Sequence, residues 1–105
     1  MATVGRDGSP HIAPVGWSYR SDEDAIEVGG PNVDRTEKYR DVCHSKSAAI
    51  VIDDVLSPWL QRGLELRGRA EAVPGPVSVI RIHPDHVVSW GLDAADGVTP
   101  EGAGR

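Results

Sequence analysis

The stretch Asp7-Gly8-Ser9-Pro10-His11-Ile12-Ala13-Pro14-Val15-Gly16-Trp17 decides the fold. It opens with turn residues and continues as a predicted strand over 11–19, with Pro14 near the middle. Because proline has no N–H to donate to a β-ladder, we expect this strand at a sheet edge, at a bulge or at a patch of unpaired backbone. Unpaired backbone offers a surface for a ligand; the alternative is that Pro14 simply protects an edge strand.

The overall composition bounds the classes of protein that this chain can be. It has 105 residues and a formal net charge of −5, which suits one domain and argues against a general nucleic-acid binder. No apolar run approaches the roughly 18 residues that would span a bilayer, and no signal-peptide pattern follows Met1. We therefore expect no membrane or nucleic-acid partner, and a cytoplasmic location. Cys43 is the single cysteine, which excludes an intramolecular disulfide.

β-Branched residues dominate the apolar set. Valine and isoleucine outnumber leucine, and phenylalanine is absent; such residues fit pleated sheets and are stiff in helices. The sequence predicts a mostly-β chain with one helix over 35–44. The expected strands are 2–4, 11–19, 25–29, 48–54, 64–73, 77–83 and 86–90, with a loop over 56–63 and a turn at 84–85. Because the chain has few aromatic residues, its core would bury a limited apolar area. The folded monomer would therefore be only marginally stable, and we expect a dimer.

Three of these segments carry more specific expectations. Asp34 and Glu37 resemble a capping box at the helix start, and Tyr39, Val42 and Cys43 are candidates for its buried face. The run 48–54 is apolar without alternation, so both of its faces are expected to be covered. The strand 64–73 alternates cleanly and carries small residues on its inward half, which indicates the tight curvature of a barrel.

A candidate phosphate seat follows the third strand. The strand ends in an open Gly29-Gly30-Pro31 corner and leads to a helix start with Thr36 and Lys38. A helix N-terminus offers free N–H groups and a positive dipole end, Lys38 adds a point charge, and Thr36 adds a hydroxyl donor. The alternative is an ordinary capped helix on the surface.

The order of these segments resembles the split β-barrel of the pyridoxamine 5'-phosphate oxidase superfamily, and in particular its actinobacterial branch that uses the deazaflavin coenzyme F420. The resemblance covers about residues 2–93, and the order and spacing of its motifs carry it rather than any single one. The matching segments are 2–11, 13–15, 29–32, 36–42, 52–54, 67–71, 82–84 and 89–92.

The resemblance implies an all-β, FMN-binding split barrel of six to seven antiparallel strands, with a domain over 1–93 and a flexible tail over 94–105. It implies an oxidoreductase that acts on a small organic substrate with F420, or alternatively FMN, bound between the two subunits of a homodimer. The cofactor-binding residues that it implies are Ala13, Pro14 and Val15 behind the ring system, Val28, Gly29, Gly30, Thr36 and Lys38 around the phosphate, and Trp90, which either contacts the partner's cofactor or packs.

Catalytic residues stay unassigned, because no Tyr, His or Asp is placed to serve as a general acid. One alternative is a non-catalytic flavin- or deazaflavin-binding module or a degenerate family member; another is a small β-barrel interaction protein without a ligand. No metal site is expected, because the His83-x-x-His86 pair has no third ligand with matching spacing.

Two departures from the family pattern bear on the site. Relatives usually carry a basic residue beside the lysine, where this chain has Glu37, and a carboxylate there repels phosphate unless it turns away. Relatives also carry a helix before the first strand, whereas Met1 stands where that strand begins. This difference suggests either that the true start of the chain lies upstream of Met1 or that this chain is a trimmed form without that helix.

Overall fold

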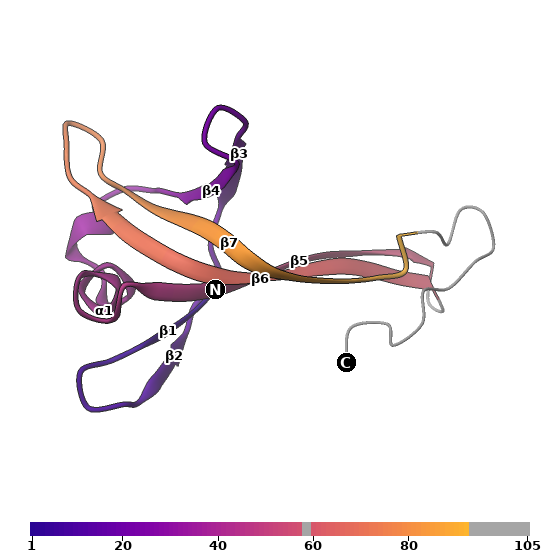
Figure 1. The fold of residues 1–105 in the computed structure, drawn as a ribbon, viewed down its shortest axis with the longest axis horizontal. Helices are drawn as coiled ribbons and strands as arrows, with labels where there is room; N and C mark the ends of the chain where they lie inside the picture. Colours follow the sequence, from indigo (N-terminus) through magenta and orange to yellow (C-terminus); the bar gives the residue numbers. More distant parts are fainter. Residues whose placement is uncertain (58–59, 93–105) are drawn as a thin grey trace.

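The computed structural model describes residues 1–57 and 60–92, so Trp59, which belongs to the loop expected over 56–63, and the tail expected over 94–105 lie outside the described residues. Seven strands in this part form one antiparallel sheet in the order β2-β1-β5-β6-β7-β4-β3 (Figure 1). The elements are β1 (Ala2–Val4), β2 (Pro10–Ile12), β3 (Trp17–Arg20), β4 (Ala25–Val28), the 3₁₀ turn η1 (Val33–Arg35), α1 (Glu37–Ser45), β5 (Ser47–Ser57), β6 (Leu60–Val73) and β7 (Val79–Trp90). The expected all-β class with one α-helix is confirmed, and the fold is split-barrel-like.

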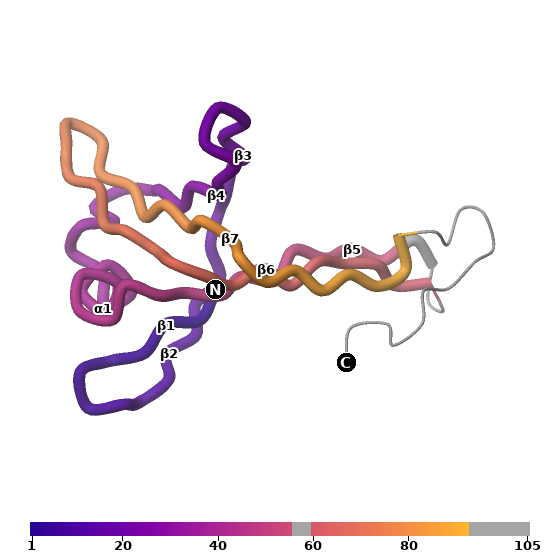
Figure 2. The backbone as a smooth tube through the Cα atoms, in the orientation of Figure 1, coloured from indigo at the N-terminus to yellow at the C-terminus, as the bar shows by residue number. Residues whose placement is uncertain are grey.

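The barrel is split between β2 and β3. These two strands end the sheet on opposite sides, yet the short segment 13–16 joins them. Five Cα steps span at most roughly 18 Å, so the sheet must curl enough for this segment to join its two edges. Figure 2 shows the segment passing behind the N-terminus from β2 to β3. The predicted single strand over 11–19 is therefore wrong, while the expected break in backbone pairing around Pro14 is confirmed.

A β-bulge replaces the turn expected at Pro84 and Asp85. Arg67 pairs with His86 and Gly68 pairs with Pro84, so Asp85 is the extra residue and β7 continues as one strand. A Cβ on Gly68 would lie 2.9 Å from the Asp85 nitrogen and would also collide with the His83 carbonyl oxygen. The glycine thus lets the two strands approach where β7 bends.

The helix differs from the expected one in its N-cap and in one residue of its buried face. Thr36, not Asp34, is the N-cap of α1, because its hydroxyl oxygen accepts from the Tyr39 N–H. Cys43 is exposed, so its place on the buried face is wrong. Tyr39 and Val42 are buried as expected, and they pack in one core with residues from the sheet. The other fully packed members of this core are Ile26, Val28, Val33, Ala48, Ile50, Leu66, Ala70, Ile80 and Ile82.

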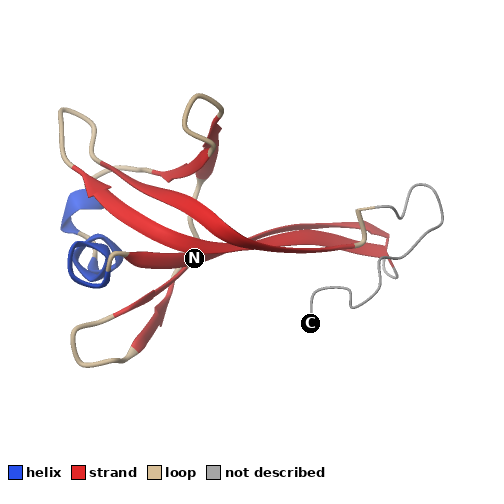
Figure 3. Ribbon diagram, viewed as in Figure 1, coloured by secondary structure: helices blue, strands red, loops and turns tan. Residues whose placement is uncertain are grey.

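The strands β5, β6 and β7 extend beyond the helix as a three-stranded arm (Figure 3). Alternation on β6 is confirmed, because Leu66 and Ala70 are buried. The expectation that both faces of 48–54 are covered is wrong for the single chain, since Val51 is 53% exposed. Other large apolar side chains exposed on the arm are Val55, Leu60 and Val87. The described chain therefore leaves apolar arm surface open.

Candidate functional site

A small cavity joins the segment after β2 to the start of α1. Its volume is about 110 Å³. Its lining brings Ala13, which is expected behind the ring system, together with Thr36 and Lys38, which are expected around the phosphate. Thr3, His11 and Glu37 line the same space. We call this cavity and the first turn of α1 the anion corner.

Segment 13–16 carries main chain with little pairing. Ala13 still pairs, because its N–H donates to the Met1 carbonyl at 3.0 Å and its carbonyl accepts from the Met1 nitrogen at 2.9 Å. Pro14 is exposed, Val15 is half-buried, and neither lies in a strand. The next strand then pairs Trp17 with Val28, so the segment runs from the anion corner toward the Gly-Gly corner.

The Gly-Gly corner offers backbone rather than side chains. Val28 is fully buried and pairs with Ile80, so its side chain serves the core. Gly29 and Gly30 are exposed, and Gly30 has a φ of 139°, a conformation that glycine adopts without steric cost. At this corner only main-chain groups and the space beside the two glycines are open to a ligand.

The donors at the helix start fit a phosphate group. The N–H groups of Glu37 and Lys38 belong to the first turn, where no intrahelical acceptor exists. Lys38 has no carboxylate within salt-bridge distance among the residues that the structure describes. The Thr36 hydroxyl, in contrast, donates to the Val33 carbonyl and accepts from the Tyr39 N–H, so its expected role as a donor to phosphate does not fit this geometry.

A buried carboxylate beside the anion corner escaped the sequence analysis. Asp41 is 5% exposed, and one of its oxygens accepts from Thr3 Oγ1 at 2.7 Å and lies 2.6 Å from His11 Nδ1. The other ring nitrogen, His11 Nε2, lies 3.7 Å from Glu37 Oε1. The one available signal was that Glu37 and Asp41 are four residues apart and so share a face of the helix.

This arrangement shifts two pKa values in opposite directions. Burial raises the pKa of Asp41, but the hydrogen bonds from His11 and Thr3 outweigh burial, so the net pKa lies below its ordinary value. The hydrogen bond to Asp41 raises the pKa of His11, and the nearby charges of Asp41 and Glu37 add to this increase. The charged pair is thus favoured in the folded chain.

Stability should therefore depend on pH through this pair. The His11 contribution is full below its ordinary pKa of 6.5 and is lost as pH rises through the raised pKa of the folded chain. The Asp41 contribution is full above 3.8 and is lost as pH falls through its lowered pKa. We expect the pair to stabilise the fold most between these two values, measured by urea denaturation from pH 3 to 9. His11→Asn keeps a donor near the Nδ1 position but removes the ring's charge, so this variant should show no decline at high pH, and its decline at low pH should begin at a higher pH.

Trp90 lies apart from the other expected site residues. It ends β7 on the arm, opposite Gly63, where an added Cβ would come within 2.6 Å of the indole ring. The ring is half-buried against this glycine. Within one chain, none of the cavities that hold Ala13, Gly30 or Lys38 includes Trp90.

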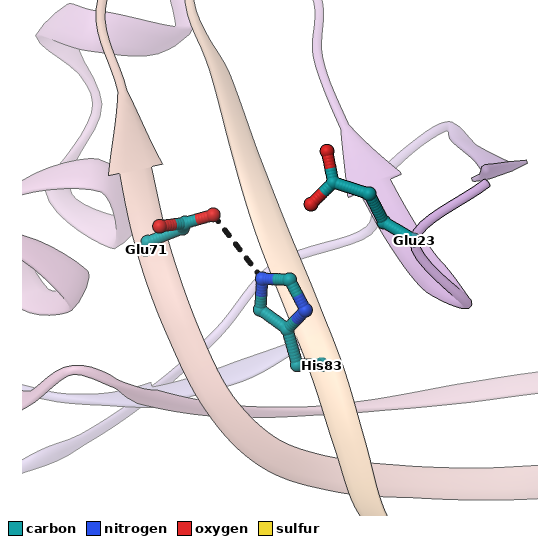
Figure 4. Close-up of side chains that lie close together, drawn as sticks. All are labelled: Glu23, Glu71 and His83. Atoms are coloured by element: carbon teal, nitrogen blue, oxygen red, sulfur yellow. Dashed lines mark hydrogen bonds and ion pairs between the residues drawn. The ribbon is translucent and has the colours of Figure 1, made fainter.

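A separate cluster holds His83 with two glutamates (Figure 4). One carboxylate oxygen each from Glu23 and Glu71 and one ring nitrogen of His83, the atoms that could ligate a metal ion, lie within 4.8 Å of one another. His83 Nε2 is 3.1 Å from Glu71 Oε1. Arg81 already pairs with both carboxylates, at 3.4 Å to Glu23 and 3.5 Å to Glu71. We interpret the cluster as an ion-pair network that ties the β3–β4 turn to β6 and β7, because a cation already offsets its charge.

Comparison with known proteins places the chain in a family. No protein-family model matches it, and no helix in the described part is long and apolar enough to cross a membrane. Its fold is similar to that of the conserved hypothetical protein Rv2991 of Mycobacterium tuberculosis, with a TM-score of 0.74 and 17% identity over 99% of this chain and 82% of that one. It is 32% identical, over all of its length and 87% of the relative, to a 5a,11a-dehydrotetracycline/5a,11a-dehydrooxytetracycline reductase of Streptomyces rimosus. The chain therefore belongs to the family of this reductase.

Proposed function

We propose that this chain is a cytoplasmic, homodimeric oxidoreductase that binds F420, or FMN in its place, and reduces a small organic substrate. The observation that carries the proposal is the anion corner, where two first-turn N–H groups lie beside Ala13 with Lys38, which has no carboxylate partner within residues 1–57 and 60–92. The reductase relative supports the same chemistry at the level of reaction class.

The residues of the chain would divide the cofactor between two regions. The phosphate would lie at the N–H groups of Glu37 and Lys38, with the ammonium of Lys38 beside it. The ring system would lie along the main chain of 13–16 and the open corner at Gly29 and Gly30. The cofactor-binding set that we propose is Ala13, Pro14, Val15, Val28, Gly29, Gly30, Thr36, Lys38 and Trp90, with Thr36 acting as the helix cap and Val28 through its main chain.

A second copy of the chain would complete the groove. Ligand cavities usually measure about 300–1,000 Å³, whereas the anion corner measures about 110 Å³, enough for one end of a cofactor. The apolar arm surface around Val51 needs a partner, and a partner's arm would bring the partner subunit's Trp90 toward the cofactor.

The substrate would carry a reducible carbon–carbon double bond. The name of the relative denotes substrates that lack two hydrogens of a tetracycline skeleton, and we extend this class to the present chain. The bound cofactor would supply a hydride to one carbon and become oxidised, while a proton adds to the other carbon. The residues of the chain would hold both partners in place, and the proton donor is not assigned to a side chain.

Spectral titration tests the proposal. We expect purified protein to change the absorbance of oxidised F420 or of FMN at saturable, micromolar concentrations, and protein with reduced cofactor to consume 5a,11a-dehydrotetracycline. Binding without turnover of any such enone would favour the non-catalytic module, which Glu37 and the engaged Thr36 hydroxyl also favour. Failure to bind either cofactor would contradict both the oxidoreductase and the non-catalytic binding module. The remaining hypothesis would then be a small β-barrel interaction protein without a ligand.

The dimer yields a further expected result. Val51→Glu places a charge on the exposed apolar face of β5 and should convert the dimer to monomer, because an unpaired charge in an apolar interface costs several kcal/mol. Val77→Glu is the matched control, since Val77 is 77% exposed in the β6–β7 turn, outside the arm. Sedimentation at micromolar concentration measures both variants. A wild-type chain that sediments only at 11.2 kDa would contradict the dimer.

A further inference from the structure

Glu37 poses a problem for an anion in the anion corner. Among the described residues that line this cavity, it is the only carboxylate. It stands on the first turn of α1, next to Lys38 and the free N–H groups. A phosphate bound there would meet this charge at close range, so the site needs something that offsets it.

The ring of His11 is held in place by three parts of the chain. Its Nδ1 lies 2.6 Å from Asp41 Oδ2 on α1, and Thr3 Oγ1 on β1 donates to the same oxygen at 2.7 Å. In the turn after β1, a Cβ on Gly5 would lie 2.8 Å from His11 Cε1, so this glycine leaves a slot for the ring. With Nδ1 fixed on Asp41, the ring presents Nε2 to Glu37 Oε1 at 3.7 Å.

We propose that His11 is a positioning residue of the anion corner: its imidazolium, oriented by Asp41, holds and neutralises the Glu37 carboxylate so that the helix start can accept a phosphate ester. The inference rests on the phosphate site proposed above. It assigns a purpose to the Asp41–His11–Glu37 series, in which a carboxylate orients the ring through one nitrogen and the other nitrogen acts on Glu37.

The charges around His11 favour the protonated ring. The titratable and charged groups that face it or line the cavities that it shares are the α-amino group of Met1 at the start of the chain, Asp7 and Arg6 from the β1–β2 turn, and Glu37, Lys38, Arg40, Asp41, Cys43 and His44 from α1. The hydrogen bond to Asp41 is the main cause that raises the pKa of His11, and Asp7 and Glu37 act in the same direction. Phosphate binding should therefore weaken as pH rises through this pKa, because Glu37 then loses its counter-charge.

The test compares FMN binding by the wild type with binding by His11→Asn. The asparagine amide can still donate to Asp41 from the Nδ1 position, but it carries no charge toward Glu37. Isothermal titration from pH 5.5 to 9 gives the ratio of the two dissociation constants. The phosphate itself ionises near pH 6, but this ionisation affects both proteins alike and cancels in the ratio. We expect weakening of about two- to fivefold at low pH, the size of an exposed ion pair, and a ratio near one at high pH.

Glu37→Gln provides the readout that a merely structural role would not move. In this background His11→Asn should change the FMN affinity by no measurable factor, because no carboxylate is left to neutralise. NMR titration of the His11 ring should also show a lower pKa in Glu37→Gln, and a higher one when FMN binds to the wild type.

The outcomes separate the inference from the proposed function. A low-pH ratio that collapses in the Glu37→Gln background supports the inference. If Lys38→Gln weakens FMN binding but the His11→Asn ratio is independent of pH, or unchanged in Glu37→Gln, the inference is wrong and the phosphate site stands. If Lys38→Gln binds FMN as the wild type does, the inference and the phosphate site are both wrong. If the wild type binds neither FMN nor F420, the proposed function is wrong as well.

Discussion

Gly68→Ala is expected to lower the free energy of unfolding by about 3 kcal/mol or more, the upper part of the range for overpacking. The added Cβ would meet main-chain atoms on both sides of the bulge, including the Asp85 nitrogen at 2.9 Å. These atoms belong to paired strands, so they cannot rotate away as a flexible side chain would. Relief requires the β6–β7 pairing to open where β7 bends, and urea denaturation measures the loss.

Gly75→Ala is the matched control for this change. Its nearest neighbour would be the Val77 carbonyl oxygen at 3.8 Å, an ordinary contact. We expect a change within about 0.5 kcal/mol, as for most surface substitutions. Equal effects at the two glycines would show that the bulge tolerates a side chain and that the approach of the strands is not what requires Gly68.

Patterns along the chain predicted the elements whose signals are local. The alternation on 64–73 and the β-branched composition indicated strands, and Ala2–Val4 and Ala25–Val28 were placed to within a residue. The bulge at Asp85 was missed because Pro-Asp is also turn chemistry, and only the partner strand decides between the two. The loop expected over 56–63 was wrong at 56–57 and 60–63, since these residues lie in β5 and β6, which continue to pair beyond Asp54.

In the candidate site, too, the features with local sequence signals were predictable and those that depend on distant contacts were not. The open Gly-Gly corner and a helix that begins near Thr36 and Lys38 could be predicted, because glycine and capping signals lie within a few residues, although the capping pattern pointed to Asp34 and the N-cap is Thr36. The bonds from Asp41 to His11 and Thr3 cross 30 and 38 residues of sequence, and no periodicity announces such contacts. The expected contact of Trp90 with the cofactor cannot be judged from one chain, because that contact would involve a second subunit.

Lys38→Glu is expected to weaken cofactor binding by at least 10- to 150-fold. Loss of a charge-assisted contact costs about 1.5–3 kcal/mol, and the new carboxylate would stand beside Glu37 and add repulsion toward a bound phosphate. Folding should hardly change, because Lys38 makes no ion pair within the described chain and such positions are worth under about 0.5 kcal/mol. Titration with FMN and F420, together with a urea denaturation curve, measures both quantities.

Lys46→Glu makes the same change of charge at the opposite end of the helix. Lys46 is exposed, and its ammonium donates to the Cys43 carbonyl at 3.4 Å. A negative charge at a helix C-terminus costs about 0.3–1 kcal/mol of stability, so this control should fold less well than Lys38→Glu and yet bind cofactor as the wild type does. This crossed result requires that Lys38 acts on the ligand and Lys46 on the helix. Equally weakened binding in the two variants would instead mean that the net charge of the chain governs binding, and binding by both as tight as that of the wild type would mean that neither lysine contributes. In either case Lys38 would lose its place in the site.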